Sequence, residues 1–200
     1  MSYLIVIIIA YFIGAISPAR IITHMVLGID IRDVNSKSAG TSNALMTLGI
    51  KYGVLVGLLD LLKGLLPVLI LKFIFPDNEV IWIVGGLSAV LGHIYPIYMG
   101  FHGGKGTATF GGVIIGIAPL YSLPLIAIFT ILTLLINYIA VSTLIVITFI
   151  PVGMFFDNYS YISITLVILF VILSFYKHFA NLKRIYLKKE VGLREAFGSK

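Results

Sequence analysis

The chain has 200 residues, of which 60% are apolar and 11% are charged, and it contains no cysteine. The lack of cysteine excludes disulfides, thiolate nucleophiles and zinc sites built from cysteine. So apolar a composition predicts that the chain lies in a lipid bilayer as one membrane-embedded domain over residues 1–200, without a separate soluble module. The net charge of +6 gathers near the C-terminus, and a basic tail at a membrane favours anionic lipid over nucleic acid as its partner.

Apolar stretches and the polar segments between them predict the membrane spans in chain order. The stretches long enough to cross a bilayer cover about 3–27, 52–75, 80–99 and 159–176. A polar segment at 30–51 follows the first stretch, and an acidic turn at 76–79 separates the second from the third. Between Lys105 and Asp157 there is no charged residue, so this region must also lie in the membrane.

The distribution of charge predicts how often the uncharged region crosses. Basic residues prefer the cytoplasmic side, so the segment at 30–51, the loop at Lys105 and the basic tail should all lie inside. Because the loop at Lys105 and the basic tail are both expected inside, the chain must cross the membrane an even number of times between them. The stretch 159–176 is the last crossing, so the uncharged region must cross three times, as three short helices. Turn and interface residues near Pro119 and Asn137 mark the expected breaks. We therefore expect an all-α integral membrane protein with about seven transmembrane helices, an outside N-terminus and a cytoplasmic C-terminus.

The segment Gly100-Phe-His-Gly-Gly-Lys-Gly-Thr107 is the strongest candidate for chemistry. Adjacent glycines allow successive N–H groups to face one point, the lysine adds a positive charge, and a following helix directs its N-terminus at the same point. These features favour an anion, above all a phosphate, at the membrane surface. The segment is not a nucleotide P-loop, because Gly106 and not Ser or Thr follows Lys105. Close helix packing is the alternative explanation for the glycines.

Two further polar segments, expected to join this loop on the cytoplasmic side, carry candidate ligand contacts. Residues 35–43 are dense in hydroxyl and amide groups, which cap helices or bind polar ligands, and Lys37 adds a charge. In the tail, His178, Asn181 and Arg184 share one helical face, as a site for a phosphorylated small molecule requires.

The predicted spans contain the ionisable residues Arg20, Asp60, Lys63 and His93. Asp60 and Lys63 lie one helical turn apart and are expected to pair with each other. His93 is either a member of the site or the donor of an interhelical hydrogen bond, because an ionisable group at that depth needs a partner. Arg20 has no evident local partner and could face a polar cavity.

Five motifs together resemble the PlsY family of bacterial acyl-phosphate-dependent glycerol-3-phosphate acyltransferases, over nearly the whole chain. The motifs are Gly28-Ile-Asp-Ile-Arg32, Leu59-Asp-Leu-Leu-Lys-Gly64, Gly92-His-Ile-Tyr-Pro96, Gly103-Gly-Lys-Gly-Thr-Ala-Thr109, and His178-Phe-Ala-Asn181 with Arg184 and Glu190. The resemblance implies a seven-helix membrane enzyme that transfers an acyl chain from acyl phosphate to the 1-hydroxyl of glycerol 3-phosphate, giving lysophosphatidate. It implies no cofactor and no metal.

The resemblance also implies roles for individual residues. Catalytic roles fall to Lys105, Ser36 and His178. Contacts to acyl phosphate fall to Gly103, Gly104, Lys105, Gly106 and Thr107. Contacts to glycerol 3-phosphate fall to Lys37, Asn43, His178, Asn181 and Arg184. An acyl phosphate is a mixed anhydride and already activated, so positioning and charge stabilisation suffice and no covalent nucleophile is needed.

Three departures from the family pattern change the charge. Met46 stands where the family has an arginine expected to hold the acceptor phosphate, and a lost charge-assisted contact costs about 1.5–3 kcal/mol. Lys37 and Lys188 each stand where the family has glycine, and Lys37 could restore the missing charge. Two alternatives therefore stay open: a divergent paralogue that acylates another phosphorylated polyol, and a non-catalytic binder or transporter of phosphorylated lipid precursors.

Overall fold

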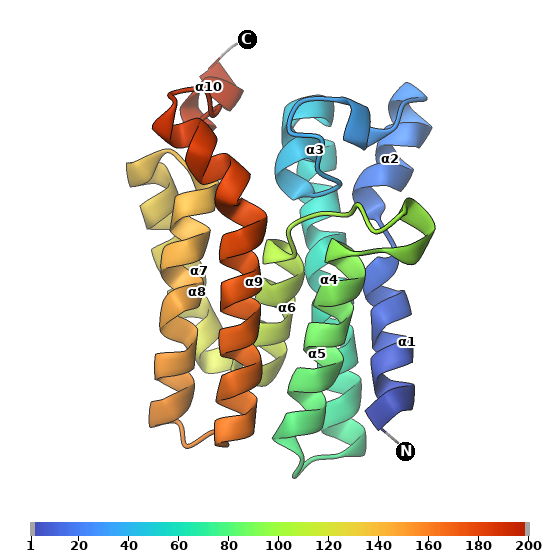
Figure 1. The fold of residues 1–200 in the computed structure, drawn as a ribbon, viewed down its shortest axis with the longest axis vertical. Helices are drawn as coiled ribbons and strands as arrows, with labels where there is room; N and C mark the ends of the chain where they lie inside the picture. Colours follow the sequence, from blue (N-terminus) through green and yellow to red (C-terminus); the bar gives the residue numbers. More distant parts are fainter. Residues whose placement is uncertain (1–2, 199–200) are drawn as a thin grey trace. The chain divides into compact units, whose positions relative to one another are not determined.

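The computed structural model describes residues 3–198, and every regular element within that range is helical (Figure 1). The elements are α1 (Tyr3–Ala15), α2 (Pro18–Leu27), η1 (Ile31–Asp33), α3 (Thr41–Leu48), α4 (Ile50–Ile74), α5 (Glu79–Ile94), η2 (Ile97–Met99), α6 (Thr107–Ile117), α7 (Pro119–Ile136), α8 (Ile139–Phe156), α9 (Tyr161–Tyr186) and α10 (Leu193–Gly198). The all-α fold class predicted from composition is confirmed.

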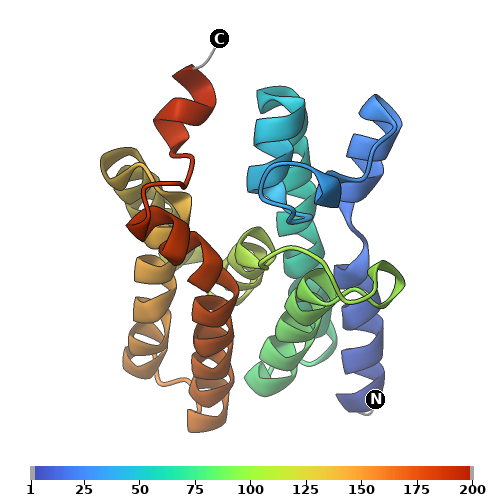
Figure 2. The same ribbon diagram turned by 45° about the horizontal axis from the view of Figure 1, so that its top comes forward.

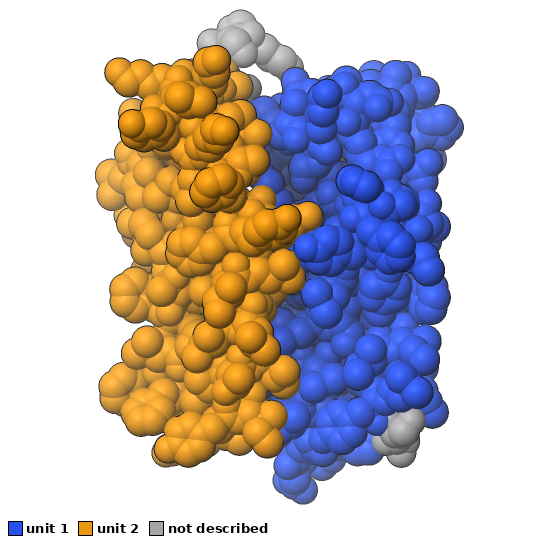
Figure 3. Space-filling model, viewed as in Figure 1, with its two compact units in different colours: residues 1–118 blue, residues 119–200 orange. Residues whose placement is uncertain are grey.

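The chain divides into two compact units, residues 1–118 and residues 119–200, which Figure 3 distinguishes by colour. The first unit contains α1 to α6 and the second contains α7 to α10. Two expectations involve both units: that the chain forms a single domain, and that the three polar segments meet on one side of the membrane. Both stay predictions.

Six segments within the described chain are long and apolar enough to cross a bilayer. They are 3–27, 50–74, 79–99, 119–136, 139–156 and 161–186. Many of their leucine, isoleucine and phenylalanine side chains are exposed on the surface of the chain, as lipid-facing residues are, although 79–99 is mostly buried. A multi-pass membrane protein is therefore confirmed.

The uncharged region forms three helices, with breaks where they were expected. One break lies at Ala118, between α6 and α7, and the other lies at Asn137 and Tyr138, between α7 and α8. Asn137 adopts a left-handed backbone with φ of 70°, a conformation that asparagine tolerates better than most residues. Because α6 has only 11 residues, it is about 16 Å long against a hydrocarbon core of about 30 Å. The count of seven spans therefore stays a prediction.

The first span is broken, which the sequence analysis did not anticipate. Residues 3–27 form two helices because Ser17 caps α2 through its side chain and Pro18 takes the first helical position. The break leaves the carbonyl of Ile16 without a helical partner, and Lys63 Nζ on α4 donates to it at 2.7 Å. A lysine from another helix thus stabilises the interruption.

Glycines bring the helices of the first unit into close contact. A β-carbon at Gly92 on α5 would collide with the backbone of Tyr11 on α1, and one at Gly112 on α6 would collide with the backbone of Leu61 on α4. Small residues at such contacts let helix backbones approach in a membrane, where packing replaces the hydrophobic effect as the driving force. The short helix α6 ends against α4, where Lys72 Nζ donates to the carbonyls of Gly116 and Ile117 at 3.1 and 3.3 Å.

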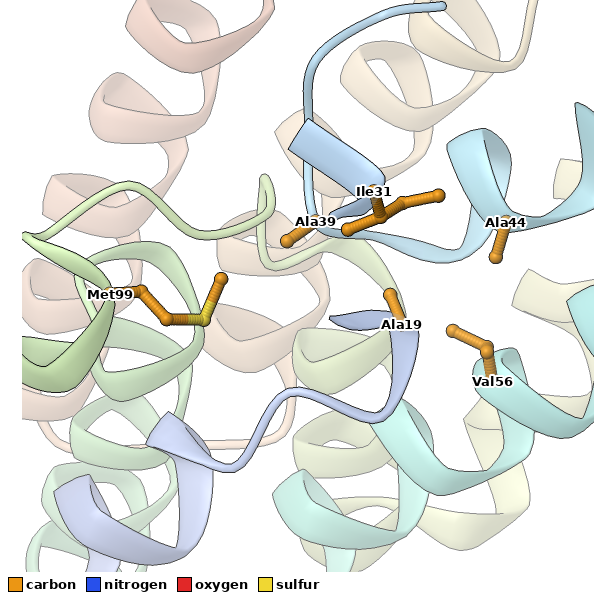
Figure 4. Close-up of a cluster of buried hydrophobic side chains, with 6 residues drawn as sticks. All are labelled: Ala19, Ile31, Ala39, Ala44, Val56 and Met99. Atoms are coloured by element: carbon orange, nitrogen blue, oxygen red, sulfur yellow. The ribbon is translucent and has the colours of Figure 1, made fainter. Parts of the chain in front are cut away.

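A small apolar core supports the polar segments of the first unit. Figure 4 shows its six side chains: Ala19, Ile31, Ala39, Ala44, Val56 and Met99. All six are buried. Because Ala39 lies in the first polar segment and Met99 directly precedes the glycine-rich one, this core holds the two segments close together.

Candidate active site

The glycine loop, defined here as residues 100–106, lies at the same end of the first unit as the segment 28–40, as two views show (Figures 1 and 2). It follows η2 and ends at Gly106, whose φ of 83° makes it the left-handed cap of α6. No side chain caps this helix. The first N–H groups of an α-helix lack partners within the helix, so Thr107 begins a helix end suited to an anion.

Gly103 and Gly104 have a different task from the one expected for them. Their N–H groups donate to the carbonyls of Ile94 and His93, both at 3.1 Å. A β-carbon at Gly104 would collide with the ring of His93. In this arrangement the two amides hold the loop against the end of α5 and do not point at a common anion. The anion-binding hypothesis is therefore narrowed to the Lys105 side chain and the start of α6.

Backbone and side-chain hydrogen bonds join the glycine loop to the segment 28–40. The carbonyl of Gly103 accepts from the N–H of Ala39 at 3.3 Å. Arg32 donates to the carbonyl of Met99, just before the loop, at 2.9 Å. These contacts confirm that two of the three predicted polar segments, both in the first unit, are neighbours.

Arg20 has a partner that the sequence analysis missed. Its Nε donates to Asp30 at 3.1 Å, and Arg32 donates to the same carboxylate at 2.8 Å. The hydrogen bond from Arg32, more than the one from Arg20, holds the pKa of Asp30 well below its usual value of 3.8. Asp30 in turn raises the pKa of Arg32. Arg20, which we expected to face a polar cavity, therefore belongs to an ion-pair network with Asp30 and Arg32.

Asn43 organises the segment 28–40 from within. Its amide nitrogen donates to the carbonyls of Ile31, Val34 and Ser38 at 2.8, 3.1 and 3.0 Å, and the side chain is buried. With its nitrogen committed to three carbonyls, Asn43 shapes the turn. The structure thus gives its amide nitrogen a structural task, and the contact to glycerol 3-phosphate expected of Asn43 stays a prediction.

Ser36 and Lys37 lie on the accessible part of this segment. Ser36 is partly buried and Lys37 is exposed. Lys37 has a φ of 55°, a left-handed backbone that glycine adopts without cost and lysine does not. Met46, at the position where the resemblance leads one to expect arginine, is partly buried on α3.

A buried polar cluster lies beneath the glycine loop. Asp60 Oδ1 is 2.9 Å from Lys63 Nζ and 3.3 Å from His93 Nδ1, and the Thr41 hydroxyl donates to Asp60 Oδ2 at 3.3 Å. The expected pair of Asp60 and Lys63 is confirmed. Of the two interpretations of His93, the structure shows the interhelical contact, since His93 lies on α5 and Asp60 on α4.

The tail residues of the second unit are organised by one carboxylate. Glu190 accepts from Asn181 Nδ2 at 2.6 Å and from Arg184 Nε at 2.5 Å. Because both residues belong to α9, these contacts confirm that they share a face of that helix. His178 is buried, with Nδ1 2.9 Å from the carbonyl of Ser174.

The fold and these polar groups define an all-helical integral membrane protein with a lysine-bearing loop at a helix N-terminus. The family model described as "Glycerol-3-phosphate acyltransferase" matches residues 4–188. The chain is 39% identical over 192 residues to the glycerol-3-phosphate acyltransferase of Bacillus subtilis (strain 168), covering 95% of this chain and 97% of that one. It is also 39% identical over 191 residues to the enzyme of the same name from Pelagibacter ubique (strain HTCC1062), with 95% and 97% covered.

Solved structures agree with the sequence comparison. The crystal structure of PlsY, an integral membrane glycerol 3-phosphate acyltransferase, in its glycerol 3-phosphate form superposes with a TM-score of 0.90 at 33% identity, covering 96% of each chain. Its lysophosphatidic acid form gives a TM-score of 0.86 at 31% identity, covering 98% of this chain and 97% of that one. The chain belongs to the PlsY family of glycerol-3-phosphate acyltransferases, and it is an enzyme of the acyltransferase class.

Proposed function

We propose that this enzyme transfers an acyl group from acyl phosphate to the 1-hydroxyl of glycerol 3-phosphate, at the cytoplasmic face of the cell membrane. Family membership over nearly the full length is the observation that carries the proposal. Two forms of the similar crystal structure, named for glycerol 3-phosphate and for lysophosphatidic acid, support this acceptor and this product. The intact segment 103–109 at the start of α6 supports a phosphorylated donor.

The proposed reaction needs no covalent intermediate on the protein. The acceptor hydroxyl oxygen attacks the acyl carbonyl carbon, the new ester bond forms, and the bond from that carbon to the phosphate oxygen breaks. Inorganic phosphate leaves, and a substrate phosphate takes the proton of the hydroxyl. The products are lysophosphatidate and inorganic phosphate, so atoms and charge balance without an added reactant.

Each side chain then has one task in this scheme. Lys105, with the N-terminus of α6 at Gly106 and Thr107, stabilises the negative charge that develops on the departing phosphate. Ser36 and Lys37 contact the polar substrates from the accessible part of the segment 28–40. His178, Asn181 and Arg184 contact the acceptor, with Glu190 fixing the last two.

A transfer assay tests the proposal. The native chain is purified, reconstituted in lipid vesicles and supplied with labelled glycerol 3-phosphate and acyl phosphate of two chain lengths, with acyl-CoA as the comparison donor. We expect labelled lysophosphatidate from acyl phosphate and none from acyl-CoA. If neither acyl phosphate gave product, the proposal would be contradicted. Product from acyl-CoA alone would show that acyl-CoA, and not acyl phosphate, is the acyl donor.

A second candidate function, suggested by Met46 and Lys37, is acyl transfer to a phosphorylated polyol other than glycerol 3-phosphate. Met46 removes a positive charge that the resemblance leads one to expect, and Lys37 adds one in a backbone conformation that costs free energy. A screen of phosphorylated polyols in the same assay separates the candidates. A reaction with glycerol 3-phosphate alone would eliminate the second one. The non-catalytic alternative is set aside by the family assignment.

A further inference from the structure

We infer that Asp60 is a positioning residue for the glycine loop, acting through His93 and Thr41. The claim that Asp60 holds the loop in place stands on the contacts alone. The claim that this helps to bind the acyl donor rests on the proposed function. Asp60 is 1% exposed and lies on α4, outside both the glycine loop and the segment 28–40.

The first connection runs from Asp60 to the loop through His93. The His93 ring lies 3.3 Å from the Asp60 carboxylate through Nδ1, while its other edge lies against Gly104 so closely that a β-carbon there would collide with Nε2. The carbonyl of the same histidine accepts from the Gly104 N–H at 3.1 Å. His93 thus supports the loop through both its ring and its backbone, and Asp60 fixes the ring.

The second connection runs from Asp60 to the other polar segment. The Thr41 hydroxyl donates to Asp60 Oδ2 at 3.3 Å, and Thr41 is the first residue of α3, directly after the segment 28–40. Ala39 of that segment donates to the carbonyl of Gly103. A single carboxylate therefore fixes both sides of the contact between the two polar segments.

Lys63 completes the arrangement by balancing charge. A carboxylate buried in a membrane protein without a positive partner carries a large desolvation cost. Lys63 Nζ lies 2.9 Å from Asp60 and also donates to the Ile16 carbonyl at the break between α1 and α2. The cluster accordingly fixes three interruptions of regular helix: residues 16–17, the start of α3 and the glycine loop.

Hydrogen exchange tests the structural part of this inference. Exchange is followed by mass spectrometry in peptides covering 96–107 and 36–44, for the native chain and for Asp60→Asn, His93→Gln and Thr41→Val. Ser88→Ala is the matched control, because Ser88 is buried on the same helix as His93 and bonds only within that helix, to Val84. We expect exchange of the 96–107 peptide to accelerate about tenfold in Asp60→Asn and His93→Gln.

The pattern across peptides separates positioning from loss of the fold. In His93→Gln and Thr41→Val, which keep the pair of Asp60 and Lys63, acceleration confined to the two polar segments supports positioning, and equal acceleration in peptides from the middle of α1 and α5 overturns it. Native-like exchange of the 96–107 peptide in His93→Gln also overturns it. If Asp60→Asn does not fold, His93→Gln and Thr41→Val, which remove one connection each, decide the question; Thr41→Val should affect the 36–44 peptide most.

Kinetics supply the functional readout. In His93→Gln we expect the KM for acyl phosphate to rise about tenfold while kcat changes less than about threefold, because the loop is displaced but Lys105 is kept. Rates are referred to the folded fraction of each sample, and an unchanged KM for acyl phosphate in His93→Gln would overturn the assignment. Should the native chain not use acyl phosphate, the proposed function fails while the exchange experiment still decides whether Asp60 positions the loop.

Discussion

Asp60 in the first unit and Glu190 in the second each join several polar side chains, but the two carboxylates differ in burial and in the elements they connect. Asp60 is 1% exposed, and its partners come from α3, α4 and α5. The side chain of Glu190 is 16% exposed, and its two partners both lie on α9, six and nine residues away. The first is a tertiary element of the fold and the second is a local one at its edge. Removing them should therefore have different consequences.

The largest expected effect is on stability and comes from Asp60. Asp60→Ala leaves Lys63 buried without its carboxylate, which should lower the free energy of unfolding by about 3–5 kcal/mol. Glu190→Ala should cost only about 1 kcal/mol, because Arg184 is 37% exposed and water replaces its partner. Thermal unfolding in one detergent compares the two variants with the native chain. Equal losses would contradict the distinction between a tertiary and a local carboxylate.

A smaller effect concerns Lys37, in the accessible part of the first unit's polar segment. Lys37→Gly should stabilise the chain by about 1 kcal/mol, because glycine adopts a φ of 55° without cost. If Lys37 provides the charge that Met46 lacks, the KM for the acceptor should rise about tenfold in the same variant.

A control for Lys37 separates backbone from charge. Lys37→Asn removes the charge while asparagine still tolerates the left-handed conformation. We expect the same rise in KM as in Lys37→Gly, with a smaller gain in the unfolding midpoint. An unchanged KM in both variants would show that Lys37 does not bind the acceptor.

The smallest effect is the pH dependence of Asp30, the most exposed of the carboxylates that join these segments. Since arginine neighbours depress its pKa in the folded chain, its contacts stabilise the fold above the usual value of 3.8 and lose that contribution as the pH falls below it. The unfolding midpoint should therefore drop more steeply between about pH 4 and about pH 2 in the native chain than in Asp30→Asn. Parallel curves for the two proteins would contradict this assignment. The effect should shrink in high salt.

What the sequence predicted well was local, and what it missed was tertiary. The pair of Asp60 and Lys63 follows from helical spacing, and the break at Asn137 follows from residue type. No spacing rule could place Asp60 against His93, because 33 positions of chain separate the two. Nor could it place Lys63 on the Ile16 carbonyl, although Ser17-Pro18 could have signalled that the first span is broken.

The candidate site shows the same limit. The residue types of the site predicted that it binds a phosphate. The direction in which each hydrogen-bond donor points depends on the backbone conformation, which could not be predicted from residue type. Gly103 and Gly104 turned inward onto α5, and Asn43 turned onto the carbonyls of its own turn. Three groups expected to donate to a ligand are thus hydrogen-bonded to carbonyls of the protein, and Lys105 is the principal positive group proposed to bind acyl phosphate.

The most direct measurement is equilibrium binding of a non-hydrolysable acyl phosphonate to the native chain and to Lys105→Met in lipid vesicles. Loss of a charge-assisted phosphate contact should weaken binding about ten- to one-hundredfold. Lys51→Met is the matched control, because Lys51 is an exposed lysine of the same unit whose Nζ lies over the Tyr52 ring. Native-like affinity in Lys105→Met, or an equal loss in Lys51→Met, would contradict the claim that Lys105 holds the donor phosphate.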